Sequence, residues 1–198
     1  MLSFNSLIKY LKNIEGMVFM LIGNGSKNQF RYIKDLKQIL KKILRKIPNK
    51  SSFLYFGDSS NKKNPDIGYA FELISTMRKD IDFYMIQIKE AQSWGFPKFV
   101  KDVYWHNDYT KKCKWGGIDN GKPCSNTKKW VSLHRYTKIK KGFVLGGGSV
   151  TLDEIELFKK LNIEYEYYPM ERRYLGDGKT KVKNTDSKKE RIGITYME

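Results

Sequence analysis

A run of three glycines between two apolar segments is the part of this sequence best suited to chemistry. Residues 143–145 are apolar and predict a buried strand, whereas apolar residues across 149–161 recur at helical spacing. Gly146, Gly147 and Gly148 lie between these two segments. A glycine-rich turn that opens a helix leaves backbone N–H groups pointing outward, and the helix dipole favours negative charge there. The run therefore predicts a phosphate-binding turn.

Polar residues at the start of the expected helix agree with this interpretation. Ser149 or Thr151 is expected to cap the helix, and Asp153 and Glu154 supply the acidic first turn that helices favour. A structural alternative stays open, in which the glycines only permit a tight turn between strand and helix. Three consecutive glycines cost more backbone entropy than such a turn requires, which favours the binding role.

Two earlier apolar segments, 17–22 and 52–56, are also followed by glycine-containing turns. Ligands of open α/β sheets bind beyond the carboxyl ends of the strands, so all three turns are expected to meet at one edge of a sheet. A carboxylate at a strand tip is suited to a ribose hydroxyl or to capping the next helix. The candidate binding residues in these two turns are Gly23, Gly25, Ser26, Gly57 and Asp58.

Segments of strand length alternate with segments of helical period along most of the chain. This alternation predicts an α/β fold with an open, mostly parallel sheet flanked by helices, which is a Rossmann-like architecture. We expect strands at 17–22, 52–56, 83–88, 143–145 and 163–168, and helices at 1–16, 30–44, 67–77 and 149–161. One domain is expected over 1–175, followed by a polar, basic tail at 176–198.

Residues 94–135 interrupt the alternation and contain all four Trp residues. We interpret them as an insert in that domain, an aromatic-rich loop or β-ribbon over the ligand edge, with a tight hairpin turn at Asn120 and Gly121. In an alternative interpretation, Val103 and Trp105 belong to a fourth core strand and the remainder is an ordinary long loop.

The same segment holds both cysteines and both histidines of the chain. Their spacing lacks the two-to-four-residue pairs that are typical of structural zinc motifs. We therefore predict neither a metal nor another cofactor for this set, which consists of His106, Cys113, Cys124 and His134.

The net charge of +17 comes from 38 basic and 21 acidic residues. Clustered cations attract nucleic acid, so a nonspecific nucleic-acid partner is one interpretation. Of the basic residues 31 are Lys and seven are Arg, and a Lys-dominated surface is the weaker signal for specific phosphate contacts. A solvated surface enriched in Lys by codon bias is the alternative.

The sequence contains no apolar run long enough to span a bilayer, so we predict no membrane partner. The first sixteen residues have helical periodicity with polar interruptions, unlike the apolar centre of a signal peptide. We expect an amphipathic helix there and an intracellular, cytoplasmic protein.

Residues 145–154 resemble the proline-glycine-glycine-x-glycine-threonine-x-x-glutamate signature of the LOG proteins, which are cytokinin riboside monophosphate phosphoribohydrolases. Gly146 replaces the proline of that signature, and Val150 replaces a glycine. The LOG proteins belong to the wider SLOG group of Rossmann-like nucleotide-binding domains, and the turns at 23–26 and 57–59 resemble the group's earlier glycine turns. The resemblance implies that Thr151 binds a nucleotide phosphate and that Glu154 acts at the ribose during N-glycosidic cleavage.

These observations favour a nucleotide-binding protein that takes a nucleoside phosphate or an ADP-ribose-type ligand, with hydrolysis at the N-glycosidic bond as an open question. The alternative is a basic nucleic-acid-binding or virion-type structural protein on an α/β scaffold without catalysis. A third interpretation is a homo-oligomer that pairs through its helices.

Overall fold

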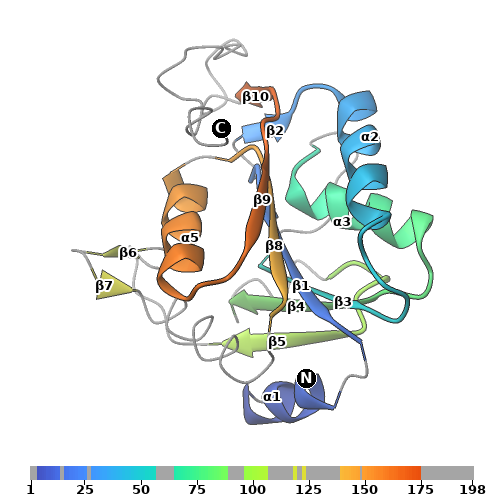
Figure 1. The fold of residues 1–198 in the computed structure, drawn as a ribbon, viewed down its shortest axis with the longest axis vertical. Helices are drawn as coiled ribbons and strands as arrows, with labels where there is room; N and C mark the ends of the chain where they lie inside the picture. Colours follow the sequence, from blue (N-terminus) through green and yellow to red (C-terminus); the bar gives the residue numbers. More distant parts are fainter. Residues whose placement is uncertain are drawn as a thin grey trace.

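A parallel β-sheet with helices on both faces forms the centre of the molecule (Figure 1). The computed structural model describes residues 4–13, 16–25, 28–56, 65–88, 96–106, 118–119, 122–123, 139–147 and 149–174. The helices are α1 (Phe4–Lys12), α2 (Ile33–Leu44), α3 (Ile67–Met77) and α5 (Ser149–Lys160). The strands of the main sheet are β1 (Val18–Gly23), β3 (Ser52–Phe56), β4 (Asp82–Ile88), β5 (Asp102–His106), β8 (Lys141–Leu145) and β9 (Tyr165–Tyr168). This architecture confirms the predicted open α/β, Rossmann-like fold.

The order of the strands reverses beside β1. Across the sheet the order is β5-β4-β3-β1-β8-β9, and every neighbouring pair is parallel. From β1 the chain therefore adds β3, β4 and β5 on one side and later returns to place β8 and β9 on the other. The boundary between β1 and β8 is the topological switch point, where ligands of such sheets bind beyond the carboxyl ends.

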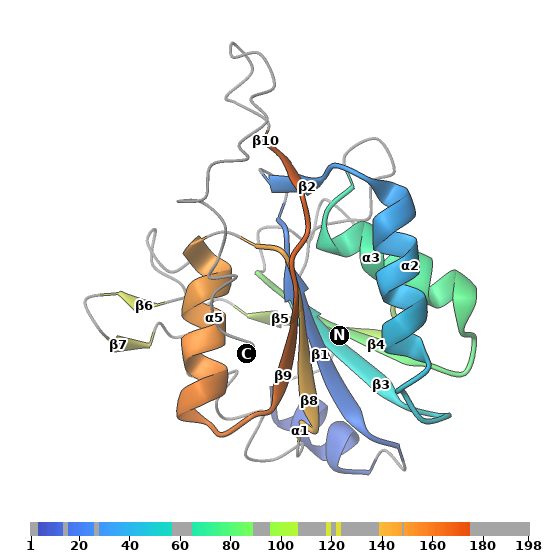
Figure 2. The same cartoon turned by 45° about the horizontal axis from the view of Figure 1, so that its top comes forward.

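The sheet is buried on both faces because its strands alternate two sets of apolar side chains. In β1, Phe19 and Leu21 join the core beneath α2 and α3, whereas Val18, Met20 and Ile22 join the core beneath α5. Figure 2 shows α2 and α3 on one side of the sheet and α5 on the other. Such continuous apolar runs are typical of parallel strands that are covered on both faces.

Strand β5 settles one alternative left open by the sequence. Its residues pair in parallel with β4, with Val103 opposite Met85 and Trp105 opposite Gln87. The core-strand alternative for Val103 and Trp105 is therefore confirmed, and residues 102–106 belong to the main sheet. Burial of Val103 against β4 and the core explains why the strand forms.

Two short ribbons accompany the main sheet. The strands β6 (Ile118–Asp119) and β7 (Lys122–Pro123) are antiparallel and flank residues 120–121, as expected for the predicted hairpin turn. The strands β2 (Asn28–Phe30) and β10 (Arg172–Tyr174) form a second antiparallel pair, which the sequence analysis did not anticipate. Of the expected insert, the structure describes residues 96–106, 118–119 and 122–123. The rest of it, including Asn120 and Gly121, and the tail at 176–198 lie outside the described part. Within that part, none of the helices has both the length and the apolar character needed to cross a bilayer.

Candidate functional site

Two of the three predicted glycine turns meet at the switch point. Gly23, at the end of β1, is in register with Leu145, at the end of β8. The backbone N–H of Asn24 donates to the Leu145 carbonyl oxygen at 3.1 Å. The carboxyl ends of β1 and β8 are thus joined directly, as the sequence predicted. Ser26, Gly57, Asp58 and Gly148 lie outside the described residues, so the position of the third turn stays a prediction.

Three glycines at this junction have no room for a side chain. A Cβ on Gly23 would lie 2.1 Å from the Leu145 carbonyl oxygen, and one on Gly147 would lie 2.5 Å from Thr151 Oγ1. A Cβ on Gly146, whose φ is +62°, would lie 2.7 Å from Asn24 Oδ1. The glycines therefore allow two backbone turns and the start of α5 to pack closely, which is a structural role whether or not a ligand binds.

Gly25 differs from the other glycines of the site. It is exposed, and a Cβ at this position would have no described atom within 4 Å. Packing against the described residues therefore does not require glycine there, and none of their atoms fills the space beside Gly25 at the end of β1.

Asn24 is the residue that links the two turns, and the sequence analysis did not include it among the site residues. Its side chain is fully buried, and Oδ1 accepts a hydrogen bond from the Gly147 N–H at 2.7 Å. Its backbone oxygen accepts from the Ile67 N–H at 2.8 Å, which ties the start of α3 to the same point. A polar residue between two glycines, immediately after a buried strand, was the signal that could have identified it.

The carboxamide nitrogen of Asn24 has no hydrogen-bond partner in the described structure. Its orientation is fixed, because Oδ1 must face the Gly147 N–H that donates to it. The Nδ2 group therefore lies buried between the two glycine turns, and among the described residues neither of its hydrogens has an acceptor. An unpaired buried donor costs about 1 to 3 kcal/mol. The hydroxyls of Ser52 and Tyr55 are also buried without a described partner, but Asn24 Nδ2 is distinguished by its position between the two glycine turns.

Helix α5 begins at Ser149, which changes the role of Thr151. Neither Ser149 nor Thr151 caps the helix, and the first turn contains no acidic residue, so Asp153 and Glu154 lie beyond it, contrary to the sequence prediction. Thr151 is the third residue of the first turn and is 2% exposed. Its hydroxyl donates to the Gly23 carbonyl oxygen at 3.2 Å and so ties α5 to the end of β1. The N–H groups of a first helical turn have no partners within the helix, which leaves those of α5 suited to an anion.

Glu154 lies one helical turn after Thr151, on the flank of the face that α5 buries. The neighbouring Ile155 and Phe158 are buried in the core beneath the helix, whereas Glu154 is half-buried. Because side chains three residues apart share one side of a helix, its carboxylate is on the same side as Thr151. This position is compatible with action on a ligand whose phosphate is held at the start of α5.

The ribbon of β2 and β10 joins the ends of β1 and β9 beside the site. The Arg31 N–H donates to the Glu171 carbonyl oxygen at 3.0 Å, and the two side chains form an ion pair at 3.0 Å. The Gly146 N–H donates to the Tyr168 carbonyl oxygen at 2.9 Å, which fixes the β8 turn to the end of β9. The ribbon also brings Arg172 and Arg173 into strand pairing with β2 near this edge.

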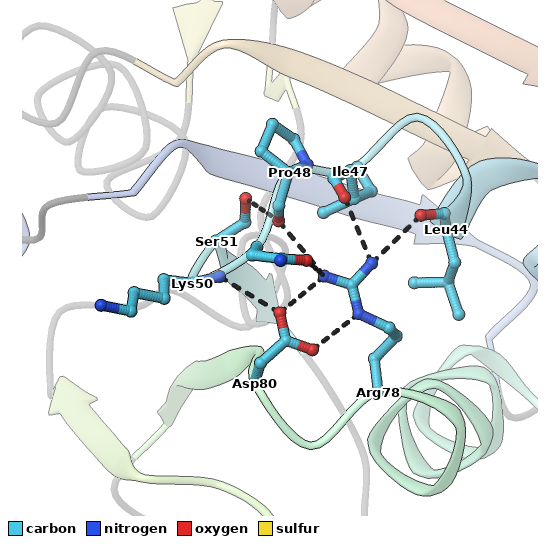
Figure 3. A network of polar contacts seen from close by, with 8 residues as sticks. Leu44, Ile47, Pro48, Lys50, Ser51, Arg78 and Asp80 are labelled. Atoms are coloured by element: carbon cyan, nitrogen blue, oxygen red, sulfur yellow. Dashed lines mark hydrogen bonds and ion pairs between the residues drawn. The ribbon is translucent and has the colours of Figure 1, made fainter.

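Arg78 lies at the opposite end of the strands and has a structural role (Figure 3). Its guanidinium binds Asp80 through two hydrogen bonds of 2.6 Å and also donates to the carbonyl oxygens of Leu44 and Ile47 at 3.3 and 3.2 Å. Leu44 is the last residue of α2 and Ile47 lies in the turn that follows it, so the guanidinium satisfies acceptors at this helix end and interacts favourably with the helix dipole. Arg78 therefore contributes nothing to the carboxyl edge.

Most of the cysteines and histidines that were considered as zinc ligands lie outside the part of the chain that the structure describes. Cys113, Cys124 and His134 lie outside the described residues, and His106 is the last residue of β5. Among the described residues, no group of three His, Cys, Asp or Glu side chains is arranged to hold a metal ion.

Comparison with known proteins does not assign this chain to a family. No protein-family model matches the sequence, and the search of curated proteins found no match.

Proposed function

We propose that this protein binds a nucleoside phosphate or an ADP-ribose-type ligand at the switch point between β1 and β8. The observation that carries the proposal is the buried, unpaired Nδ2 of Asn24 between two close-packed glycine turns. It coincides with the carboxyl edge at which open parallel sheets bind ligands, and with the start of α5.

The phosphate of the ligand lies at the first turn of α5, where the N–H groups of residues 149–151 are its donors. The N–H groups of Gly146 and Gly147 are already used within the protein, so they hold the turn and do not bind the phosphate. Protein atoms cover Asn24 Nδ2, so in this proposal the turn at Gly25 shifts when the ligand binds, and Nδ2 then donates to it. The side of Gly25 that no described atom covers admits the rest of the nucleotide.

The resemblance to the LOG signature adds a catalytic role for Glu154. In this role water attacks C1′ of the ribose, the bond from C1′ to the base nitrogen breaks, and the base leaves with a proton. A carboxylate near C1′ stabilises the positive charge that develops on the ribosyl group. The half-buried position of Glu154, one turn from Thr151, supports this assignment.

Calorimetric titration with AMP and with ADP-ribose tests the binding proposal. The variant Asn24→Asp keeps the Oδ1 acceptor for Gly147 but replaces the Nδ2 donor with an oxygen that repels phosphate. We expect at least tenfold weaker binding of both probes, because a donor to an anion is exchanged for a like charge. Asn162→Asp is the matched control, because it makes the same chemical change at an exposed residue in the turn after α5.

The thermal unfolding of each variant is measured first, so that a folding defect is not taken for a binding defect. Gly25→Leu provides a second route, since a side chain there meets no described atom and should leave the fold intact. Unchanged affinity in both Asn24→Asp and Gly25→Leu, or no binding of either probe by the wild-type protein, would refute the proposal.

A further inference from the structure

The outer face of α2 carries four cationic side chains that have no partner. Lys34, Lys37, Lys41 and Arg45 are all exposed. Within the described part of the chain, no ion pair or side-chain hydrogen bond involves any of them. We call these four residues the α2 stripe.

The α2 stripe is straight because its residues follow the helical repeat. Intervals of three, four and four residues place them on one side of the helix, with about 5 to 6 Å between neighbouring Cβ atoms. At about 1.5 Å per residue, the stripe is roughly 16 Å long. The opposite side of α2 is buried through Leu36, Leu40, Ile43 and Leu44, so the stripe lies on the side away from the core. Figure 2 shows α2 on the outside of the sheet.

Several other cations of the described structure are neutralised by acidic side chains. Single exposed lysines such as Lys98 and Lys140 have no described ion pair either, so the stripe is distinguished by the alignment of its four cations along one helix. Lys46 and Lys141 both pair with Glu166, at 2.6 and 2.8 Å, and Lys101 pairs with Asp82 at 2.7 Å. Asp35 is the only acidic residue of α2 and it lies to one side of the stripe. The three successive like-charge neighbours of the stripe each destabilise the helix by a few tenths of a kcal/mol. The helix dipole favours Lys41 and Arg45 at the carboxyl end of α2 but opposes Lys34 in the first turn, so an anionic partner would relieve the repulsion within the stripe.

We propose that the α2 stripe binds the phosphate backbone of a nucleic acid without regard to its sequence. Evenly spaced cations release counterions from a polyphosphate, and lysine suits such contacts as a mobile point charge. An anionic membrane fits less well, because interfacial helices insert exposed apolar side chains, and those of α2 are turned into the core. The stripe shares no residue with the proposed nucleotide site, so the two proposals stand independently.

The salt dependence of nucleic-acid binding tests whether the α2 stripe contacts phosphates. In the stripe variant, Lys34→Gln, Lys37→Gln, Lys41→Gln and Arg45→Gln are combined. The control variant combines Lys9→Gln, Lys98→Gln, Lys140→Gln and Lys160→Gln, which are exposed residues elsewhere. Both variants lower the net charge of the full chain by four. Fluorescence anisotropy with a random-sequence duplex DNA and with a single strand gives the affinity from 50 to 200 mM salt.

Each phosphate contact contributes about 0.9 to the slope of log affinity against log salt on duplex DNA, and about 0.7 on a single strand. We expect the stripe variant to lose about 3 units of slope and at least tenfold in affinity at low salt. The control variant should stay within about one unit of the wild-type slope. The double variant Lys37→Gln/Lys41→Gln should lose about half as much as the full stripe variant, and it decides the question if the quadruple variant fails to fold.

Equal losses in the stripe and control variants would overturn the proposal, because the attraction would then come from total charge. An unchanged slope in the stripe variant, or no binding of either nucleic acid at 50 mM salt, would overturn it as well. Vesicles with phosphatidylserine are the third probe, and stripe-dependent binding to these alone would assign the surface to membranes instead.

Discussion

At the scale of single residues, the site depends on what each polar atom already binds. The Thr151 hydroxyl and the Gly147 N–H, both expected to bind a phosphate, are used to hold β1, β8 and α5 together. At the junction of the described turns, Asn24 Nδ2 is a buried donor without a described partner. Sequence reasoning located the turns, because glycine and apolar period are local signals. It missed Asn24, because the hydrogen bond of its side chain to Gly147 spans 123 positions of the chain.

Substitution of Glu154 tests whether the protein is an enzyme or only binds its ligand. The variant Glu154→Gln keeps the size of the side chain and removes its charge, so nucleotide affinity should change less than about threefold. Release of free base from AMP, followed by chromatography, should fall by a factor of about 100 or more if the carboxylate stabilises the ribosyl cation. Glu156→Gln, an exposed residue on the same helix, is the control.

Equal release of base by Glu154→Gln and the wild-type protein would remove Glu154 from the mechanism. If the wild-type protein binds AMP and releases no base, the protein is a binder and the catalytic part of the proposal is refuted.

At the scale of elements, the sequence predicted strands and helices correctly in segments where apolar residues repeat with one period over six or more positions. Segments such as 17–22 and 67–77 have enough apolar residues at one period to identify their type. The ribbon of β2 and β10 was not predictable, because each strand has three residues and pairing joins positions about 140 apart. The cap of α5 was also misplaced at Ser149 or Thr151, because both residues lie inside the helix and the Thr151 hydroxyl is used in a tertiary hydrogen bond to Gly23.

Arg78 joins three elements at the amino end of the sheet, namely the end of α2, the approach to β3 and the end of α3 (Figure 3). Arg78→Lys keeps the charge but loses the forked contact with Asp80 and most donations to carbonyl oxygens. We expect the free energy of unfolding, measured by urea denaturation, to fall by about 1 to 2 kcal/mol. Lys79→Gln, the exposed cation beside it, should change stability by less than about 0.5 kcal/mol.

The same network predicts how stability responds to acid. Hydrogen bonds from the Arg78 side chain hold the pKa of the Asp80 carboxyl well below its ordinary value of 3.8. Because the folded pKa is the lower one, the contribution is present above pH 4 and is lost as the pH falls further. The stability difference between wild type and Arg78→Lys should therefore shrink below pH 4. A difference that is constant from pH 7 to pH 2 would contradict this account.

At the scale of the whole molecule, the two proposals use different parts of one scaffold. The nucleotide site lies at the carboxyl edge between β1 and β8, whereas the α2 stripe lies on the outer face of a helix that covers the sheet. Composition predicted a net charge of +17 but not its distribution, because lysines several positions apart become a stripe only when the helix forms. Folding of α2 thus places four of the many basic residues side by side on one surface, the α2 stripe.

The central claim, a nucleotide at the switch point, is tested most directly by the amide chemical shifts of the ¹⁵N-labelled wild-type protein during titration with ADP-ribose. The account predicts that shifts concentrate at Gly25, at Gly147 and at residues 149–151, while those of the α2 stripe stay in place. Shifts that are absent at saturating ADP-ribose, or that occur only away from the ends of β1 and β8, would contradict it.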